Sequence, residues 1–251
     1  MGTLGPMLPV VHLCERRTIN RLSSVGNVKI SPMDKHKPVY EEVAYDEARA
    51  RNYSLHHLKS LSNKISTWRE RRLARAALTE LGKLDNLLEL ATGTGRFWPV
   101  DFDVCPNAVF AMDNSLSMLR EARLQNERQP HLICGSAFQL PLPDKSLDAV
   151  LCMRFLHHLY HNEDRMVVLA ELARIARKGV VVSLWSDGNI KAGKRLQSQQ
   201  HRQFNRGFGP RICIPQKRLE QEFKLSGFRV VSSRCLLSGV SMWRIYTLAI
   251  E

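Results

Sequence analysis

Short apolar runs alternate with helical patterns between residues 83 and 185. The runs lie at 86–90, 108–112, 130–134, 147–153 and 179–184. Each run has the length of a buried strand, and the segments between the runs are long enough for crossover connections. The alternation predicts βαβ units on a doubly wound, mostly parallel α/β sheet, with the loops after the strands gathered along one edge.

The helical pattern at 163–178 is the most regular of these crossovers. Val168, Leu172 and Ile175 form one apolar stripe. Asn162 can cap the start of the helix and Gly179 can end it. We therefore expect a helix over 163–178, between the fourth and fifth strands.

The flanks of this region predict further helices and a closing hairpin. Residues 40–81 have apolar positions at helical spacing, which predicts two or three helices before the first strand; these positions include Leu58, Leu61, Ile65, Trp68, Leu73, Ala77 and Leu81. A basic stretch with few apolar residues occupies 186–215. A helix at 216–226 and strands at 228–233 and 242–250 complete the pattern, and the last two strands can pair as an antiparallel hairpin.

These elements suggest one principal domain with added pieces. Residues 1–32 have no sustained periodicity and predict a poorly ordered lead-in, so Met33 is an alternative start of translation. The single domain is expected over 33–251. It divides into a helical cap at 33–82, a core at 83–185, a basic insertion at 186–215, and a closing helix and hairpin at 216–251.

Composition agrees with a single folded domain. The chain has 251 residues, of which 44% are hydrophobic, enough for one substantial core. No stretch approaches the ~18 to 20 apolar residues of a membrane span, and the first residues lack the features of an export leader. The six cysteines are widely spread, at 14, 105, 134, 152, 213 and 235, and predict neither disulfides nor a metal site. A soluble protein of the reducing cytoplasm is expected, of undetermined oligomeric state.

The net charge of +13 is concentrated in the flanks. Residues 1–85 contain 15 basic and 9 acidic side chains, 86–185 contain 10 and 11, and 186–251 contain 12 and 4. The flanks are therefore expected to meet an anionic partner, although a solvated basic surface explains the same numbers.

A glycine-containing turn follows the first strand, in the sequence LLELATGTGRF at 87–97. Gly93 and Gly95 leave the backbone open to a ligand at the start of a helix. A dinucleotide fingerprint needs a third glycine where Trp98 stands, which disfavours a nicotinamide cofactor. Glu89, at the strand end, suits a cationic ligand instead.

This stretch resembles the first motif of the class I S-adenosylmethionine-dependent methyltransferases, E/D-x-G-x-G-x-G, with Ala91 in place of the first glycine. The resemblance implies a seven-stranded Rossmann-like sheet with an antiparallel last strand. It also implies S-adenosylmethionine as cofactor. Asp113, followed by Asn114, would accept the ribose hydroxyls. Met118 would pack near the adenine.

Two later segments extend the resemblance over about 87–185. Ser136, Ala137 and Phe138 align with the family's G-D-A-x-x-L-P-F pattern, and Ser136 stands where many members have an adenine-binding aspartate. Residues 147–159 match the fourth strand and its loop, where Arg154 adjoins the cofactor. The chain most resembles the methyltransferase type 11 group, which includes the ubiquinone and menaquinone C-methyltransferases. Residues 180–189 are also similar to the tRNA wobble-uridine methyltransferases.

The acceptor side is predicted from the loops after the fourth and fifth strands. Arg154, His158, Trp185, Asp187 and Asn189 are expected to shape the acceptor pocket, because ligands of open α/β sheets bind at this edge. His157 and His158 are candidates for a general base, and packing is the alternative role for both.

Three functions are consistent with the sequence. The first is methylation of a small or lipid-linked anionic acceptor. The second is methylation of RNA, because His201, Phe204 and Phe208 lie among basic residues that could track phosphates. The third is a binding protein that keeps the cofactor pocket without catalysis, which Ala91 and Ser136 favour slightly.

Overall fold

The computed structural model describes residues 11–12, 50–51, 61–200 and 211–251. The predicted lead-in at 1–32 lies outside the described residues except for Val11–His12. Most of the predicted helical cap before residue 61 and the RNA-binding candidates at 201–208 also lie outside them. Within the described part, no helix is both long enough and apolar enough to cross a membrane.

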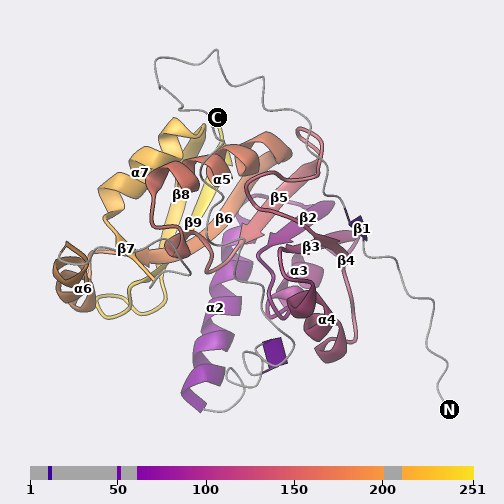
Figure 1. The fold of residues 1–251 in the computed structure, drawn as a ribbon, viewed down its shortest axis with the longest axis horizontal. Coiled ribbons are helices and arrows are strands. Elements are labelled where there is room, and N and C mark those ends of the chain that lie inside the picture. The colour runs from indigo at the N-terminus through magenta and orange to yellow at the C-terminus, as the bar shows by residue number, and fades with distance from the viewer. Residues whose placement is uncertain (1–10, 13–49, 52–60, 201–210) are drawn as a thin grey trace.

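The strands form one mostly parallel sheet (Figure 1). Its order is β1-β4-β3-β2-β5-β6-β9-β8, and β7 pairs with β6. The strands are β1 (Val11–His12), β2 (Asn86–Leu90), β3 (Ala108–Asp113), β4 (His131–Cys134), β5 (Leu147–Cys152), β6 (Ala176–Ser186), β7 (Cys213–Ile214), β8 (Phe228–Cys235) and β9 (Trp243–Ile250). Strand β9 is antiparallel to both β6 and β8. The predicted Rossmann-like fold of seven principal strands and its closing hairpin are confirmed.

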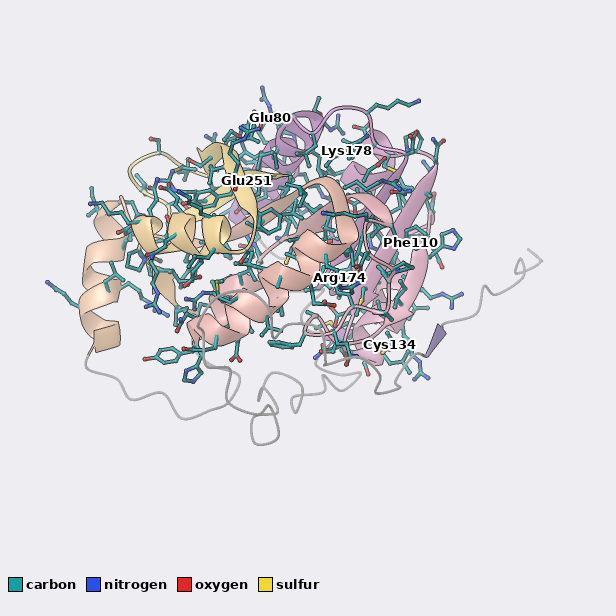
Figure 2. All side chains as sticks on the ribbon, turned by 90° about the horizontal axis from the view of Figure 1, so that it is seen from above. Glu80, Phe110, Cys134, Arg174, Lys178 and Glu251 are labelled. Carbon is teal, nitrogen blue, oxygen red and sulfur yellow. The ribbon has the colours of Figure 1, made fainter. Side chains whose placement is uncertain are left out.

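Helices cover both faces of the sheet. They are α2 (Leu61–Thr79), α3 (Trp98–Val104), α4 (Leu116–Gln125), α5 (Asn162–Ile175), α6 (Ile190–Gln200) and α7 (Gln216–Leu225), with a short 3₁₀ turn, η3 (Leu156–His158). Leu87 packs with α2 and α3 on one face, while its neighbour Leu88 packs with α5 and α7 on the other. In Figure 2, Phe110 and Cys134 mark the edge of the sheet that is remote from α6.

The helix predicted at 163–178 is shorter in the structure. Helix α5 ends at Ile175, and β6 already begins at Ala176. Gly179 therefore does not end the helix but lies inside β6, where an added Cβ would be 2.1 Å from the carbonyl oxygen of Leu248 on β9. Asn162 is the first helical residue, and the preceding His161 occupies the N-cap without a side-chain hydrogen bond. Close pairing of β6 with β9 explains the glycine.

A buried ion pair joins the two helices on one face. Arg165 of α5 and Glu222 of α7 are both buried, and the guanidinium makes two hydrogen bonds to the carboxylate. Arg165 also donates to the carbonyl oxygens of Leu159 and Tyr160, which follow β5. The pair therefore fixes the loop that leads from β5 into the predicted acceptor region.

Candidate functional site

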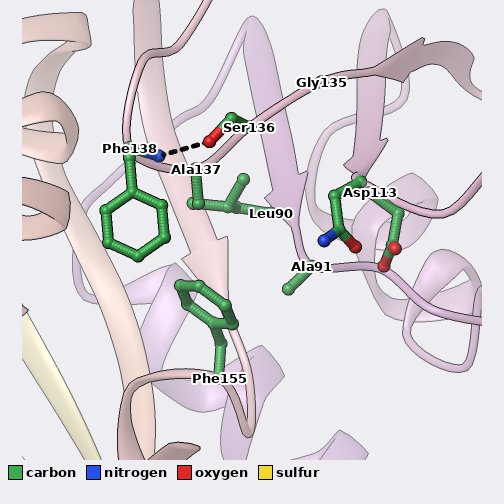
Figure 3. Close-up of a pocket in the computed structure, with 9 residues that line it drawn as sticks. Leu90, Ala91, Asp113, Gly135, Ser136, Ala137, Phe138 and Phe155 are labelled. Atoms are coloured by element: carbon green, nitrogen blue, oxygen red, sulfur yellow. Dashed lines mark hydrogen bonds between the residues drawn. The ribbon is translucent and has the colours of Figure 1, made fainter. Parts of the chain in front are cut away.

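A hollow opens at the carboxyl ends of β2, β3, β4 and β5 (Figure 3). Its volume is about 350 Å³, with open solvent at its mouth included. Its lining consists of Leu90, Ala91, Asp113, Asn114, Gly135, Ser136, Ala137, Phe138 and Phe155. Six of the eleven predicted cofactor residues are thus brought together, and Leu90, Gly135 and Phe155 are additions.

The turn after β2 has left-handed backbone at three positions. Ala91 has φ of 57°, a conformation that costs a non-glycine residue free energy and that explains why a glycine is usual there. Gly93 has nothing within 4 Å of an added Cβ, so its backbone is open to a ligand. At Gly95 an added Cβ would lie 2.7 Å from the ring of Trp98. The glycine at 93 therefore leaves room for a ligand, and the glycine at 95 leaves room for the Trp98 ring.

Asp113 ties this turn to the neighbouring strand β3. One carboxylate oxygen accepts a hydrogen bond from the backbone N–H of Gly93 at 2.8 Å, and the other accepts from Ser115 at 2.9 Å. Desolvation raises the pKa of Asp113, and these two N–H donors oppose the rise. Each oxygen has a second lone pair, so the carboxylate can accept further hydrogen bonds from a ligand in the hollow.

Glu89 lies beneath the turn and is buried rather than exposed to the hollow. Its carboxylate accepts a hydrogen bond from the Thr92 hydroxyl at 2.7 Å, and the Trp98 indole donates to that hydroxyl at 2.8 Å. Asp101 of α3 is fully buried next to Glu89, close enough for the two carboxyl groups to influence each other's pKa. Sequence reasoning missed this network, whose only local signal is an acidic residue among the apolar positions of α3.

Burial makes the Glu89 carboxyl sensitive to pH. Desolvation raises the pKa of Glu89 to about 7 from its ordinary value of 4.5, against the opposing hydrogen bond from Thr92. Burial also raises the pKa of Asp101 well above its ordinary range, and the neighbouring Glu89 adds to that rise. The two side chains therefore hold protons in the folded protein at pH values where the unfolded chain has lost them.

Replacing Glu89 with glutamine will weaken the dependence of stability on pH. The folded-state pKa is raised, so the stabilising contribution is complete below about pH 4.5 and is lost as pH rises toward 7. Between these pH values, urea unfolding will show that the free energy of unfolding falls less with rising pH in the variant than in the wild type. The difference in slope will be at most ~1.4 kcal/mol per pH unit. Glu127→Gln, at an exposed carboxylate, is the matched control. An equal decline in Glu89→Gln and wild type would contradict this account.

The remaining predicted cofactor residues divide between the hollow and its support. The Ser136 hydroxyl accepts a hydrogen bond from the backbone N–H of Phe138 at 3.2 Å, which shapes the loop after β4 (Figure 3). Met118 is buried, and its backbone N–H donates to the Ser115 hydroxyl that caps α4. Met118 is not among the residues that line the hollow.

Arg154 faces helix α2. Its backbone is left-handed, with φ of 59°, and its N–H donates to the Ser183 hydroxyl. The guanidinium pairs with Glu70 and lies 4.4 Å from the centre of the Trp243 ring. Glu70 also pairs with Arg96 at 3.0 Å. Arg154 is therefore held at the edge of the site by a carboxylate that sequence reasoning did not select.

His157, Trp185 and Trp243 form an aromatic cluster next to Arg154. His157 is fully buried, stacks on Trp185 and meets Trp243 edge-on. Within the described part of the chain, neither ring nitrogen of His157 has a hydrogen-bond partner, nor has the indole nitrogen of Trp185. Burial lowers the pKa of His157 well below its ordinary value, and that of His158 to about 4. Both imidazoles are therefore neutral near pH 7.

Asp187 and Asn189 serve the helices that follow β6. The Asp187 carboxylate accepts a hydrogen bond from the backbone N–H of Gln216, the first residue of α7. The Asn189 side chain accepts from the N–H of Ala192 and donates to the carbonyl oxygen of Ser186. Of the predicted acceptor residues, Trp185 belongs to the aromatic cluster, Arg154 contacts it, and the centre of the His158 ring lies 4.2 Å from that of His157.

Solved structures share this fold. The magnesium protoporphyrin IX methyltransferase of Synechocystis PCC 6803, solved with bound S-adenosylhomocysteine, has a TM-score of 0.58 and 16% identity, over 82% of this chain and 100% of that one. An S-adenosylmethionine-dependent methyltransferase of Clostridium acetobutylicum has a TM-score of 0.60 and 14% identity, over 80% and 98%. At these low identities, the two likenesses show a shared fold and nothing about the acceptor.

Sequence relatives match part of the chain. The malonyl-[acyl-carrier protein] O-methyltransferase of Marinomonas sp. is 29% identical over 177 residues, which are 66% of this chain and 60% of that protein. An uncharacterized methyltransferase-like protein of Schizosaccharomyces pombe is 38% identical over 82 residues, 32% of this chain and 30% of that protein. The chain therefore spans less than two thirds of the length of either relative.

The strand order and the hollow at the carboxyl edge define a class of fold. The strand order, with its antiparallel last strand, is that of the class I S-adenosylmethionine-dependent methyltransferase fold. More narrowly, residues 88–184 match the family model described as a methyltransferase domain. This range contains all the residues that line the hollow.

Proposed function

We propose that the protein transfers the methyl group of S-adenosylmethionine to an acceptor that carries a carboxylate or phosphate. The acceptor is either a small molecule or lipid-linked. The proposal depends on one observation: Arg195 and Arg211 lie over the Trp185 ring, at 5.2 and 5.6 Å, and neither forms an ion pair within the described part of the chain. Two guanidinium groups without a carboxylate partner favour an anion there.

The residues of the hollow fit a sulfonium nucleoside. Asp113 has lone pairs for the ribose hydroxyls, and the Ser136–Phe138 loop offers an apolar wall and a hydroxyl for the base. The bare backbone at Gly93 allows the ligand to approach. Glu89, Gly95 and Met118 would act without touching the ligand. Glu89 and Gly95 would support the turn after β2, and Met118 would support α4.

The aromatic cluster fits the anionic part of an acceptor. His157 and Trp185 each have buried ring nitrogens without partners in the described structure, and such groups favour a ligand that completes their hydrogen bonds. Arg154 is engaged by Glu70, which it shares with Arg96, so Arg195 and Arg211 would supply the charge for the acceptor. The Marinomonas relative is named for a malonyl acceptor, which bears a free carboxylate, and this agrees with the proposed class.

An anionic acceptor also suits the protonation state of the site. When bound, S-adenosylmethionine supplies a methyl group activated by its sulfonium. A carboxylate or phosphate oxygen is already a nucleophile and needs no general base. The neutral imidazole of His157 would donate a hydrogen bond that orients the acceptor, and the low pKa of His157 keeps the imidazole from adding a further positive charge to the cluster.

The test follows transfer of a radiolabelled methyl group from S-adenosylmethionine to two matched acceptors, malonyl-acyl-carrier protein and acetyl-acyl-carrier protein. We expect transfer to the malonyl form, which has a free carboxylate, and none to the acetyl form. Replacing Arg195 and Arg211 together with glutamine should raise KM for the acid about tenfold or more, with a smaller change in kcat.

Arg128→Gln is the matched control. Its guanidinium also lies over an aromatic ring, Phe102 at 4.0 Å, but in another part of the molecule. Equal methyl transfer to the malonyl and acetyl forms would contradict the proposal. So would equal KM values for the double variant and Arg128→Gln. If neither carrier protein is a substrate, the same assay with simple carboxylic acids and organic phosphates follows, and methylation of transfer RNA alone would favour RNA as the acceptor.

A further inference from the structure

The N-terminal half of α2 presents apolar side chains to solvent. Leu61, Ile65 and Trp68 follow one another at helical spacing and are 78%, 62% and 59% exposed. The opposite side of α2 packs on the sheet through Ala74, Ala77 and Leu78. Figure 1 shows this half of α2 extending away from the sheet. The exposed face is therefore not required for the packing of α2.

Two neighbouring segments extend this apolar face. The Arg69 side chain of α2 donates to the carbonyl oxygen of Leu236, at the start of the β8–β9 loop, where Leu237 and Val240 are exposed. The N–H of Ile190, the 81% exposed first residue of α6, donates to Gly239 of the same loop. We call the following six residues the docking surface: Leu61, Ile65, Trp68, Ile190, Leu237 and Val240. They are six of the ten large apolar side chains exposed in the described structure.

The charge around the docking surface is positive. Helix α2 contains five basic residues and one acidic residue, Glu70, which is buried and paired with Arg96 and Arg154. Lys64 and Arg72 are exposed, and Arg72 lies over the Trp68 ring at 5.7 Å. Helix α6 contains three basic and no acidic residues. Exposed apolar and aromatic residues within a basic surround are the pattern of a helix that lies on an anionic membrane.

We propose that the docking surface binds a lipid bilayer that carries anionic headgroups. Trp68 places an aromatic ring at the interface, Leu61 and Ile65 enter its apolar side, and Lys64 and Arg72 meet the headgroups. An RNA partner would need the cations but would leave the aliphatic residues exposed. A bilayer is the occupant that satisfies both features.

Only one consequence of this inference rests on the proposed function, namely the presentation of a lipid-linked acceptor to the site. Glu70 follows Trp68 by two residues and holds Arg96 and Arg154 at the site. A membrane under α2 would therefore lie close to the acceptor region, where a lipid-linked acceptor would be presented. Binding to the bilayer itself does not require methyl transfer.

The test is flotation of the full-length chain with vesicles. One set contains phosphatidylcholine alone, and in the other about one third of the lipid is phosphatidylglycerol. We expect binding to the anionic vesicles, weak binding to the neutral ones, and loss of binding as salt rises. The triple variant Leu61→Ser, Ile65→Ser, Trp68→Ser should bind anionic vesicles at least about tenfold more weakly, because three apolar side chains no longer enter the bilayer. Lys64→Glu with Arg72→Glu should weaken binding about tenfold or more.

Leu124→Ser is the matched control, because Leu124 of α4 is 78% exposed and lies outside the docking surface. It should bind vesicles as the wild type does. Unchanged binding by the triple variant, equal loss in Leu124→Ser, or no binding by the wild type would overturn the inference. A wild-type dimer that the triple variant converts to a monomer, without vesicle binding, would instead identify a second copy as the occupant.

Calorimetry with S-adenosylmethionine separates this inference from the proposed function. The triple variant should keep the wild-type affinity, since none of its three positions lines the hollow. A triple variant that has lost this affinity is misfolded, and the double charge variant then decides the outcome. If the wild type does not bind the cofactor, the proposed function fails while the vesicle result stands.

Discussion

Replacing Asp113 with alanine will reduce the affinity for S-adenosylmethionine by about a hundredfold or more. The proposed role of this carboxylate is to accept the two ribose hydroxyls, and each hydrogen bond to a charged group contributes about 1.5–3 kcal/mol. The variant also loses the anchors of Gly93 and Ser115, which position the turn beside β3. Both effects lower affinity, and calorimetry with S-adenosylmethionine and S-adenosylhomocysteine measures their sum.

Two further variants separate the ribose contacts from the support of the turn. Asp113→Asn keeps one oxygen as an acceptor and should recover part of the affinity. Asp144→Ala removes a largely exposed carboxylate that pairs with Arg174 and should bind as the wild type does. Equal affinity in Asp113→Ala and wild type would refute the ribose role, and a wild type that binds neither ligand would refute the placement of the cofactor in the hollow.

Replacing Glu222 with glutamine will lower the free energy of unfolding by about 3–5 kcal/mol, because it leaves the buried charge of Arg165 without a counter-ion. The two side chains are only 2% and 7% exposed. Arg165 also holds the carbonyl groups of Leu159 and Tyr160, so the loop after β5 should loosen. Urea unfolding measures the loss of stability, and hydrogen exchange of the loop amides measures the loosening.

An exposed ion pair provides the comparison. Arg75 and Asp103 pair at 2.8 Å, with side chains 53% and 46% exposed, so Asp103→Asn should cost less than about 1 kcal/mol. The double variant Arg165→Met, Glu222→Leu should regain most of the stability lost in Glu222→Gln, since it removes both charges together. A loss in Glu222→Gln no larger than in Asp103→Asn would show that the buried charge is compensated elsewhere.

The central parallel strands could be predicted because each contains an apolar run, whereas the two-residue strands β1 and β7 were not predicted. The predicted run at 86–90 matches β2, and the run at 108–112 differs from β3 only by Asp113. A strand that is buried on both faces needs apolar residues at successive positions, and this requirement is visible locally. The closing hairpin was likewise predictable, from two β-rich segments at the end of the chain.

The start of β6 could not be predicted in this way. Ala176, Arg177 and Lys178 have no strand pattern, and they follow directly on the helical stripe of α5. They are extended because β6 pairs along its length with β5 and β9, which lie elsewhere in the sequence. The same pairing explains why residue 179 is a glycine, although the local pattern predicted that this glycine ends a helix.

The position of a residue at the carboxyl edge was more predictable than the direction of its side chain. Ala91, Asp113 and Ser136 lie at or just beyond the ends of three different strands and all line the hollow, because parallel strands end at one edge. Arg154 follows a fourth strand, but its partner Glu70 is 84 residues away in the sequence. Asp187 and Asn189 are engaged at the starts of α7 and α6.

The sequence by itself determined the class of fold, the glycine-containing turn, and the edge at which the site forms. These features depend on apolar runs and on residues close together in the chain. Only the tertiary structure decided that Glu89 is buried with Asp101, that Glu70 holds Arg154, and that Leu61, Ile65 and Trp68 are exposed. Burial and ion pairing depend on which distant segments pack together, and helical spacing alone does not tell which face of a helix meets the core.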